Sequence, residues 1–273
     1  MFAGKVWWIT GASSGIGEAL AEALSAEGAK LILSGRNVAA LKEAAAKCKT
    51  ATHILPFEAT DFAKIPSYVD QAWGFEARID GLVNNAGISQ RSLAVDTVFD
   101  VYRKIVDIDL MAPIALTQAL LPKMINAGGG HIVAISSVAG IAGVPLRSAY
   151  CAAKHGLIGY HDSVRAETAH QGMKVLVVAP GSVKTNVSKN ALDATAQTRG
   201  VSDAAIDNGM EPAVAAKRML DGLKAGEREL ILAEGMEAAI AKMRRTDPNA
   251  LFDQMERMVA AGYARQMGAE KKS

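Results

Sequence analysis

Tyr150 and Lys154 lie four residues apart in a stretch with helical periodicity, so their side chains share one face of the predicted helix. A free tyrosine has a pKa of about 10, which is too high for a base at neutral pH. A nearby ammonium group favours the tyrosinate, so this pair can exchange a proton with a bound oxygen atom. Most pairs at this spacing simply lie on a helix surface, and the chemistry therefore depends on what surrounds them.

A serine hydroxyl is expected near this pair. Ser137 directly follows the predicted strand His131–Ser136. Open parallel sheets bind their ligands at the carboxyl ends of the strands. A hydroxyl at that edge can donate a hydrogen bond to a substrate oxygen and orient it. Ser137, Tyr150 and Lys154 are therefore the first candidate catalytic side chains.

A glycine-rich turn, Thr10–Gly17, lies between the first predicted strand and the first predicted helix. Its glycines let the backbone turn sharply and approach a pyrophosphate, and the helix N-terminus presents free N–H groups to that anion. An ordinary strand-to-helix turn is the alternative, but the strand–turn–helix context favours a dinucleotide site. The residues expected to bind the cofactor here are Gly11, Ser13, Ser14, Gly15, Ile16 and Gly17.

The second predicted strand bears on the choice of cofactor. NAD-binding folds usually carry an acidic residue about 20 residues after the glycines, where it binds the ribose 2′-hydroxyl. This chain has no carboxylate there and places Arg36 in that neighbourhood. A guanidinium can hold a 2′-phosphate in a fork, so the sequence favours NADP(H), with NAD(H) as the alternative. Arg36 could instead be a solvated surface residue that caps the turn.

The rest of the chain supplies the elements that position these residues. Apolar runs of strand length alternate with stretches of helical period, which is typical of a doubly wound parallel sheet with helices on both faces. The predicted strands are Val6–Thr10, Leu31–Ser34, His53–Phe57, Leu82–Asn84, His131–Ser136, Val175–Ala179 and Leu230–Leu232. The predicted helices are Ile16–Glu27, Val38–Lys47, Phe62–Ala77, Val98–Ile125, Ala149–His170 and Pro212–Lys224. We therefore expect a Rossmann-like α/β fold.

Neither a linker nor an internal repeat divides the chain, so residues 1–273 are expected to form one domain. Its cofactor-binding part is predicted at roughly 1–135 and its catalytic and substrate part at roughly 136–273. Ser182–Gly209 is polar, with few core signals, and predicts a mobile loop or short helical lid. The Met-rich tail Glu234–Gln266 is predicted to be helical. Core packing is favoured for its methionines over a lipid-like ligand, a membrane or a subunit.

Composition limits the partners and the compartment. The chain has 273 residues, half of them hydrophobic, and a formal net charge of +2, which does not favour nucleic acid or an anionic membrane as a partner. Cys48 and Cys151 form no disulfide framework, so a reducing, cytoplasmic compartment is expected. We expect no signal peptide, no membrane-spanning segment and, from five scattered histidines, no metal site.

Five motifs occur along the chain in order: Thr10–Gly17, Asn84-Asn85-Ala86-Gly87, Ser136-Ser137-Val138-Ala139-Gly140, Tyr150-Cys151-Ala152-Ala153-Lys154 and Pro180-Gly181-Ser182-Val183-Lys184-Thr185. Over most of the chain, their order and spacing resemble the short-chain dehydrogenase/reductase family. The spacing of Gly11, Gly15 and Gly17 resembles the compact oxidoreductase branch of that family, not the sugar-nucleotide epimerase branch.

The resemblance implies a single-domain oxidoreductase that transfers a hydride between nicotinamide and a carbonyl or secondary alcohol, and a homodimer or homotetramer. It implies that Ser137, Tyr150 and Lys154 are catalytic, that Lys154 also holds the nicotinamide ribose, and that Thr185 lies near the carboxamide. Other residues implied to border the cofactor are Asn85, Ala86, Gly87, Pro180, Gly181 and Val183. A hydrophobic ketone, steroid or lipid-like substrate is expected. A scaffold or redox sensor with weak catalysis is the alternative, and the intact catalytic trio argues against it.

Two positions depart from the family pattern. Glu58-Ala59 stands where the family often has Asp near the adenine, and both residues are expected to border the cofactor. Asp109 stands where the family usually has a catalytic Asn, whose main-chain carbonyl holds a water behind the lysine. An ionised Asp109 near Lys154 would raise the pKa of the lysine. The alternative is that Asp109 bonds only to neighbouring backbone and does not sense the site.

Overall fold

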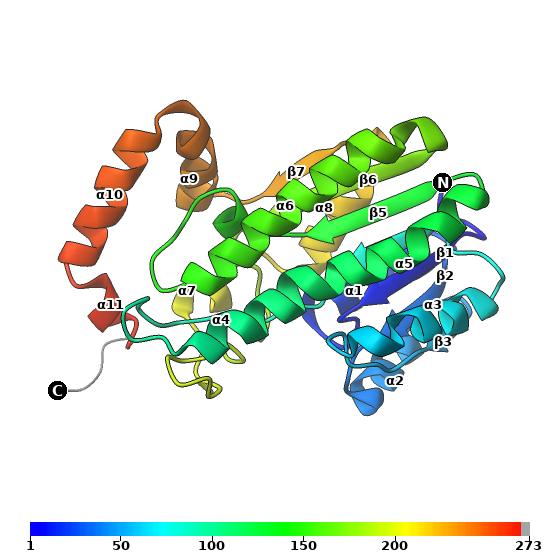
Figure 1. Ribbon diagram of the computed structural model, residues 1–273, viewed down its shortest axis with the longest axis horizontal. Coiled ribbons are helices and arrows are strands. Elements are labelled where there is room, and N and C mark those ends of the chain that lie inside the picture. The colour runs from blue at the N-terminus through cyan, green and yellow to red at the C-terminus, as the bar shows by residue number, and fades with distance from the viewer. Residues whose placement is uncertain (269–273) are drawn as a thin grey trace.

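The computed structural model describes residues 1–268, and Figure 1 shows a sheet with helices packed on both of its faces. The strands of the described residues are β1 (Val6–Thr10), β2 (Lys30–Ser34), β3 (Thr52–Ile54), β4 (Gly81–Asn84), β5 (Gly130–Ile135), β6 (Met173–Pro180) and β7 (Glu229–Leu232). They form one sheet in the order β3-β2-β1-β4-β5-β6-β7, and every neighbouring pair is parallel. The predicted doubly wound parallel sheet is confirmed. The chain reverses direction across the sheet between β1 and β4, where such folds bind ligands.

Helices connect the strands. They are α1 (Gly15–Ala26), α2 (Val38–Lys47), α3 (Ile65–Gly74), α4 (Phe99–Val106), α5 (Ala112–Asn126), α6 (Ser148–Thr168), α7 (Ala204–Asp207), α8 (Pro212–Ala225), α9 (Gly235–Thr246), α10 (Pro248–Ala260) and α11 (Tyr263–Gln266). Because successive side chains of a strand point to opposite faces, Trp7 packs into one core layer and Trp8 into the other. The Trp7 layer contains residues of α1, α2 and α8, whereas the Trp8 layer contains residues of α3, α5 and α6.

The predicted helix Val98–Ile125 is interrupted, and that expectation is corrected. A π-helical turn, Asp107–Met111, separates α4 from α5. Pro113 lacks a backbone N–H, so it cannot donate the regular helical hydrogen bond to the carbonyl of Asp109, four residues earlier. The wider turn directs Asp109 inward, where it is fully buried. Such π-turns within helices often lie at functional sites.

Two other predicted elements are shorter in the structure than expected. The predicted strand His53–Phe57 is reduced to β3, an edge strand that ends before Pro56, which has no N–H to donate. The predicted helix Phe62–Ala77 is a short 3₁₀ turn, Phe62–Lys64, followed by α3.

The segment after β6 contains little regular structure, but it is tied to the fold. Within residues 182–209 the only helix is α7, and isolated bridges join Leu192 to Gln90 and to Thr198. Val183 pairs in the same way with Met210. The segment is therefore irregular but attached to neighbouring elements, and whether it closes over a ligand stays a prediction.

The tail beyond β7 is helical, as expected. Figure 1 shows α10 standing away from the layers around the sheet, connected through α9 at one end and α11 at the other. Leu251 is buried, but Met236 is 67% exposed and Phe252 is 48% exposed. The expectation that the methionines of this tail serve core packing is therefore wrong for Met236. The arm that α9 to α11 form has too few neighbours to cover Met236 and Phe252.

One stretch also departs from the expectation that no segment is long enough to cross a bilayer. The nearly continuous helix Phe99–Asn126 is long and apolar enough for a membrane span by length and composition alone. Its buried residues Leu116, Leu120 and Met124 pack in the Trp8 core layer. Core helices of soluble proteins meet the same criterion, so the length of this helix by itself is a weak indication of a span.

Candidate active site

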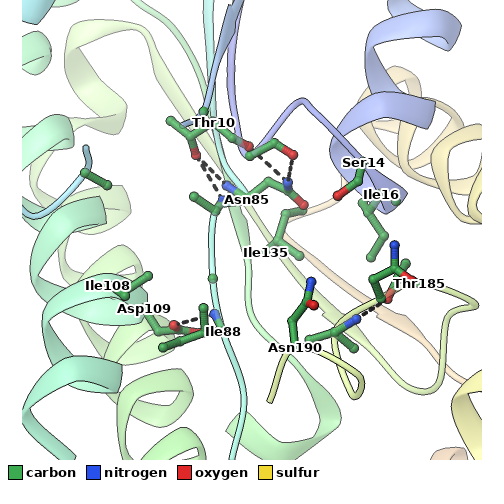
Figure 2. Close-up of a pocket in the computed structure, with 18 of the residues that line it drawn as sticks. Thr10, Ser14, Ile16, Asn85, Ile88, Ile108, Asp109, Ile135, Thr185 and Asn190 are labelled. Carbon is green, nitrogen blue, oxygen red and sulfur yellow. Dashed lines mark hydrogen bonds between the residues drawn. The ribbon is translucent and has the colours of Figure 1, made fainter. Parts of the chain in front are cut away.

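A cavity of about 550 Å³ opens at the carboxyl ends of β1, β2, β4, β5 and β6. Figure 2 shows side chains from the glycine turn, the stretch after β4, the π-turn and the segment after β6 arranged around it. The wall contains every predicted catalytic and cofactor residue except Gly17. Sequence reasoning missed other wall residues, among them Gly35, Phe57, Ile88, Lys104 and Ile108.

The glycine turn is shaped for close approach. Gly11 and Gly15 have φ angles of +65° and +58°, in the left-handed region that favours glycine. A Cβ atom at position 15 would lie 2.8 Å from the Thr185 Cγ2 atom, so the Pro180–Thr185 motif closes against the turn. Ser14 precedes α1, and its side chain makes no capping hydrogen bond. The first-turn N–H groups of α1 are therefore available to an anion in the cavity.

Asn85, the residue after β4, supports this turn. Its Nδ2 donates to the carbonyl oxygens of Thr10 (3.0 Å) and Gly11 (3.2 Å), and its backbone N–H donates to Thr10 Oγ1 at 3.0 Å (Figure 2). The Asn85 side chain was expected to lie against the cofactor. The structure places Asn85 in the cavity wall but uses its amide to hold the turn.

Gly17 does not border the cavity, which corrects its predicted role. It is buried in α1, and a Cβ atom there would lie 2.3 Å from the Gly11 carbonyl oxygen and 2.6 Å from Asn85 Nδ2. Gly17 therefore allows the helix to pack against the back of the turn. Its effect on a cofactor is indirect, through the shape of the turn.

Arg36 and Glu58 face each other at the end of the cavity nearest β2. Arg36 Nη1 lies 3.7 Å from Glu58 Oε2, and the two side chains are 70% and 45% exposed. Exposed ion pairs of this kind contribute little, about 0–1 kcal/mol, so the pair does not hold Arg36 in place. Ala59 completes this part of the wall. The sequence placed both charges at the cofactor site but did not reveal that they pair.

The three candidate catalytic residues lie together. Tyr150 and Lys154 lie on α6, with Lys154 Nζ 5.5 Å from the centre of the Tyr150 ring. The buried Nζ also donates to the carbonyl oxygen of Ile135 at 3.0 Å. Ser137 lies two residues after the end of β5, and its Oγ accepts a hydrogen bond from the Ala139 N–H (3.1 Å). All three residues border the same cavity.

Asp109 completes a buried ion pair behind Tyr150. Its Oδ2 lies 3.1 Å from Lys154 Nζ, and its Oδ1 accepts from the Ile88 N–H at 2.9 Å. A Cβ atom at position 87 would lie 2.8 Å from Asp109 Oδ2, so Gly87 leaves the space that the carboxylate occupies. The alternative that Asp109 contacts only neighbouring backbone is therefore wrong.

Burial and pairing shift the pKa values of both Asp109 and Lys154. Burial raises the pKa of Asp109, and the charge of Lys154 opposes that shift. Burial alone would lower the pKa of Lys154, but attraction to Asp109 and Tyr150 outweighs it and leaves the pKa above its ordinary value. The direction for Lys154 is the one expected from the sequence. The ammonium form is thereby favoured next to the tyrosine hydroxyl.

The start of α6 is held by a residue that the sequence analysis missed. Gln90 is fully buried, and its Oε1 accepts from the Ala149 N–H at 2.9 Å. Its Nε2 donates to Ser92 Oγ (3.1 Å) and Thr97 Oγ1 (3.2 Å). This arrangement fixes the helix end that carries Tyr150. The polar run directly after the Asn84–Gly87 motif is the signal that could have revealed it.

The far side of the cavity is formed by the segment after β6. Apolar and polar residues alternate there: Val187, Asn190, Leu192, Thr198 and Ile206. Asp203 anchors the segment, since its carboxylate accepts hydrogen bonds from Arg91 (2.6 Å) and Arg199 (2.8 Å). Both the Arg91 and the Asp203 side chains are almost fully buried.

Comparisons with known proteins agree with this geometry. The family model described as "short chain dehydrogenase" matches residues 5–196. Dehydrogenase/reductase SDR family member 7B of Mus musculus is 37% identical over 254 residues, which cover 89% of this chain and 78% of that protein. The protein of the same name from Danio rerio is 37% identical over 276 residues, which cover 98% of this chain and 88% of the relative.

Solved structures show the same similarity. A short-chain dehydrogenase from Streptomyces avermitilis superposes with a TM-score of 0.80 at 29% identity, covering 96% of this chain and 99% of its own. A levodione reductase superposes with a TM-score of 0.79 at 27% identity, covering 88% of this chain and 100% of its own. The chain therefore belongs to the short-chain dehydrogenase/reductase family, oxidoreductases that act on CH–OH groups with NAD(P) as the acceptor.

Proposed function

We propose that this protein interconverts a carbonyl group and a secondary alcohol in a small hydrophobic molecule, with NADP(H) as its cofactor. The observation that carries the proposal is the meeting of Ser137, Tyr150 and Lys154 at one cavity whose other end is the glycine turn. A scaffold or sensor that only binds the cofactor would not need this trio.

The residues present fit a dinucleotide. The N–H groups at the start of α1 are open, and glycines stand where a side chain would fill the space along the turn. Lys154, Asn85 and Thr185 would border the nicotinamide half, and Arg36 with Ala59 the adenosine half. The bound nicotinamide would supply or accept the hydride.

The chain's own side chains would handle the proton. In reduction, Tyr150 donates its hydroxyl proton to the substrate oxygen as that oxygen gains negative charge. The Lys154 ammonium stabilises the tyrosinate that remains. Ser137 Oγ donates toward the Pro180 carbonyl oxygen at 3.4 Å, a long contact that a substrate oxygen can replace.

Arg36 supports the preference for NADP(H). It is exposed and only loosely paired with Glu58, so it can turn to a 2′-phosphate and form charge-assisted hydrogen bonds. Glu58 would repel the same phosphate, and its exposure lets it turn toward solvent. Arg36 is therefore the residue on which the cofactor preference depends.

The substrate class follows from the far wall. Ile88, Val187, Leu192 and Ile206 offer apolar contact, and this favours a ketone, steroid or lipid-like substrate over a sugar. The segment 182–209 would order over the cofactor when such a substrate binds, and would exclude water. Hydrogen exchange with and without ligand tests this movement, and strong, unchanged protection in the free enzyme would rule out a lid.

The decisive experiment measures NADPH oxidation by the purified protein against steroids, fatty-acyl ketones, sugars and quinones, with NADH in parallel. We expect turnover with one of the hydrophobic carbonyl classes and preference for NADPH. Tight binding of NADPH without turnover of any compound would favour the scaffold or sensor alternative.

Assembly and location are further proposals that rest on the family resemblance and on cysteine usage. We propose a homodimer or homotetramer in the cytoplasm, with residues 1–273 acting as one domain. Light scattering of the purified protein would measure the mass of the assembly, and the mass of a monomer would contradict the proposed homodimer or homotetramer.

A further inference from the structure

Glu237, in the first turn of α9, contacts the segment that follows β6. Its Oε2 accepts from the Ser182 N–H at 2.6 Å, and its Oε1 accepts from Ser182 Oγ at 2.8 Å. Both carboxylate oxygens are thus used on one residue, 55 positions away in the sequence. Hydrogen bonds to an ionised acceptor are short and stronger than neutral ones.

The neighbouring glycine makes this contact possible. A Cβ atom at position 181 would lie 2.2 Å from Glu237 Oε2. The carboxylate therefore occupies the space that a side chain at 181 would need. Gly181 is also held by a hydrogen bond from its N–H to the Leu232 carbonyl oxygen (2.9 Å) at the end of β7. The family motif and α9 are therefore fitted to each other at this point.

The residues on either side of Ser182 belong to the wall of the active-site cavity. Pro180, Gly181 and Val183 line the cavity, and the Pro180 carbonyl oxygen is the partner of Ser137 Oγ. Thr185 closes against Gly15 of the glycine turn. In addition, α9 packs against the 3₁₀ turn Val138–Gly140 that follows Ser137. The wall beside the nicotinamide half of the cavity is thus supported from behind by α9.

We propose that Glu237 is a positioning residue, which acts through Ser182 to hold the Pro180–Thr185 wall in the shape that binds the nicotinamide half of the cofactor. The inference rests on the proposed function for the identity of that ligand. It makes the C-terminal arm part of the active-site support, although the arm lies outside residues 5–196, where the family model matches.

The test compares Glu237→Ala with Glu234→Ala as a matched control. Glu234 precedes α9, is exposed and pairs with Arg218 instead of the wall. Loss of a charge-assisted contact predicts that NADPH binds about tenfold more weakly to Glu237→Ala, measured by cofactor fluorescence. Glu234→Ala should stay within about twofold of the wild type. Glu237→Gln still has an oxygen that can accept a hydrogen bond, so it should bind NADPH more tightly than Glu237→Ala. Ser182→Ala loses only the hydroxyl contact, so it should also bind NADPH more tightly than Glu237→Ala.

A second readout does not depend on activity or on cofactor. In the free protein, the Ser182 amide should exchange its hydrogen faster in Glu237→Ala than in the wild type, because its acceptor is gone. A double-mutant cycle tests whether positions 181 and 237 are coupled. Gly181→Ala should weaken NADPH binding strongly in the wild type and much less in the Glu237→Ala background, where the carboxylate that the new Cβ would meet is gone.

The outcomes separate the two proposals. Unchanged NADPH affinity and unchanged Ser182 exchange in a folded Glu237→Ala protein would overturn the positioning role. An equal loss in Glu234→Ala would also overturn it, since the effect would then belong to α9 as a whole. If the wild type binds no dinucleotide, the proposed function fails, while faster Ser182 exchange would still establish the Glu237 contact.

Discussion

The two sides of the cavity are built in different ways. The cofactor side is a short turn whose shape comes from glycine conformations and from backbone carbonyls held by Asn85. The far side is an irregular segment held by buried charges: Arg91, 112 positions away in the sequence, and Arg199, within the segment, both bond to Asp203. The first can be expected from local sequence, whereas the second depends on long-range charges. The shape of the glycine turn should therefore tolerate the loss of a single charge better than the substrate wall does.

The charges of the far side are unusually concentrated. Arg91 and Arg199 bond to Asp203, and Arg147 lies 3.8 Å from it, so three guanidinium groups share one carboxylate. Burial, and then repulsion from Arg147, lowers the pKa of Arg91 to about 10. Removing the single carboxylate would leave positive charges facing each other without compensation.

The largest expected effect is on chemistry at the junction of the two sides. Tyr150→Phe keeps the ring and its packing but removes the proton donor. Turnover should fall by about 10²–10⁴-fold, while NADPH binding by fluorescence titration should be unchanged. Substantial residual reduction would mean that another group delivers the proton.

The comparison between the two sides is tested by Asp203→Asn. Leaving buried guanidinium groups unpaired should cost about 3–5 kcal/mol of the free energy of unfolding. Asp207→Asn is the matched control, since Asp207 is an exposed residue at the end of α7, the short helix that Asp203 precedes, and its carboxylate accepts from Ser202 Oγ. Denaturant unfolding of both variants measures the difference, and equal stability would show that the cluster does not hold the segment.

The pH dependence of the same residue has a defined sign. Burial alone would raise the pKa of Asp203, but bonds from Arg199 and Arg91 leave it below the ordinary value of 3.8. Its stabilisation is therefore present above pH 3.8 and is lost as the pH falls through the lowered pKa. The Asp203→Asn protein should lack this acid-induced loss, and an identical acid limb for both proteins would contradict the assignment.

A smaller effect is expected at the adenosine end. Arg36→Asp should weaken NADPH binding by roughly tenfold or more, the equivalent of one lost charge-assisted contact of about 1.5–3 kcal/mol. NADH binding should be spared, because it has no 2′-phosphate. If the wild type uses both cofactors equally and the variant binds NADPH unchanged, Arg36 is only a surface residue.

The smallest effect is expected for Asp109→Asn. It removes the anion that raises the pKa of Lys154, so the alkaline limb of the pH–rate profile should move to lower pH while turnover is retained. Asp109→Leu should be worse, because the Ile88 N–H and Lys154 would lose a buried partner. Near-complete loss of turnover in a folded Asp109→Asn protein would mean that the carboxylate takes part directly in the chemistry.

The sequence by itself determined the sheet, its helices and the family. Apolar runs of strand length that alternate with stretches of helical period predicted the parallel sheet, since strand and helix periods follow from local backbone geometry. The strand–turn–helix context predicted a glycine turn at the sheet edge. The spacing of Tyr150 and Lys154 placed both on one helix face, and both border the cavity with Ser137.

Only the tertiary structure decided which distant side chains meet. Asp109 pairs with Lys154 across 45 positions, and Glu237 contacts Ser182 from beyond β7. No local pattern encodes these contacts, because they depend on the order of the strands and on the π-turn that directs Asp109 inward. Charged groups are readable in a sequence, but the partner of each one is set by the packing that buries them together.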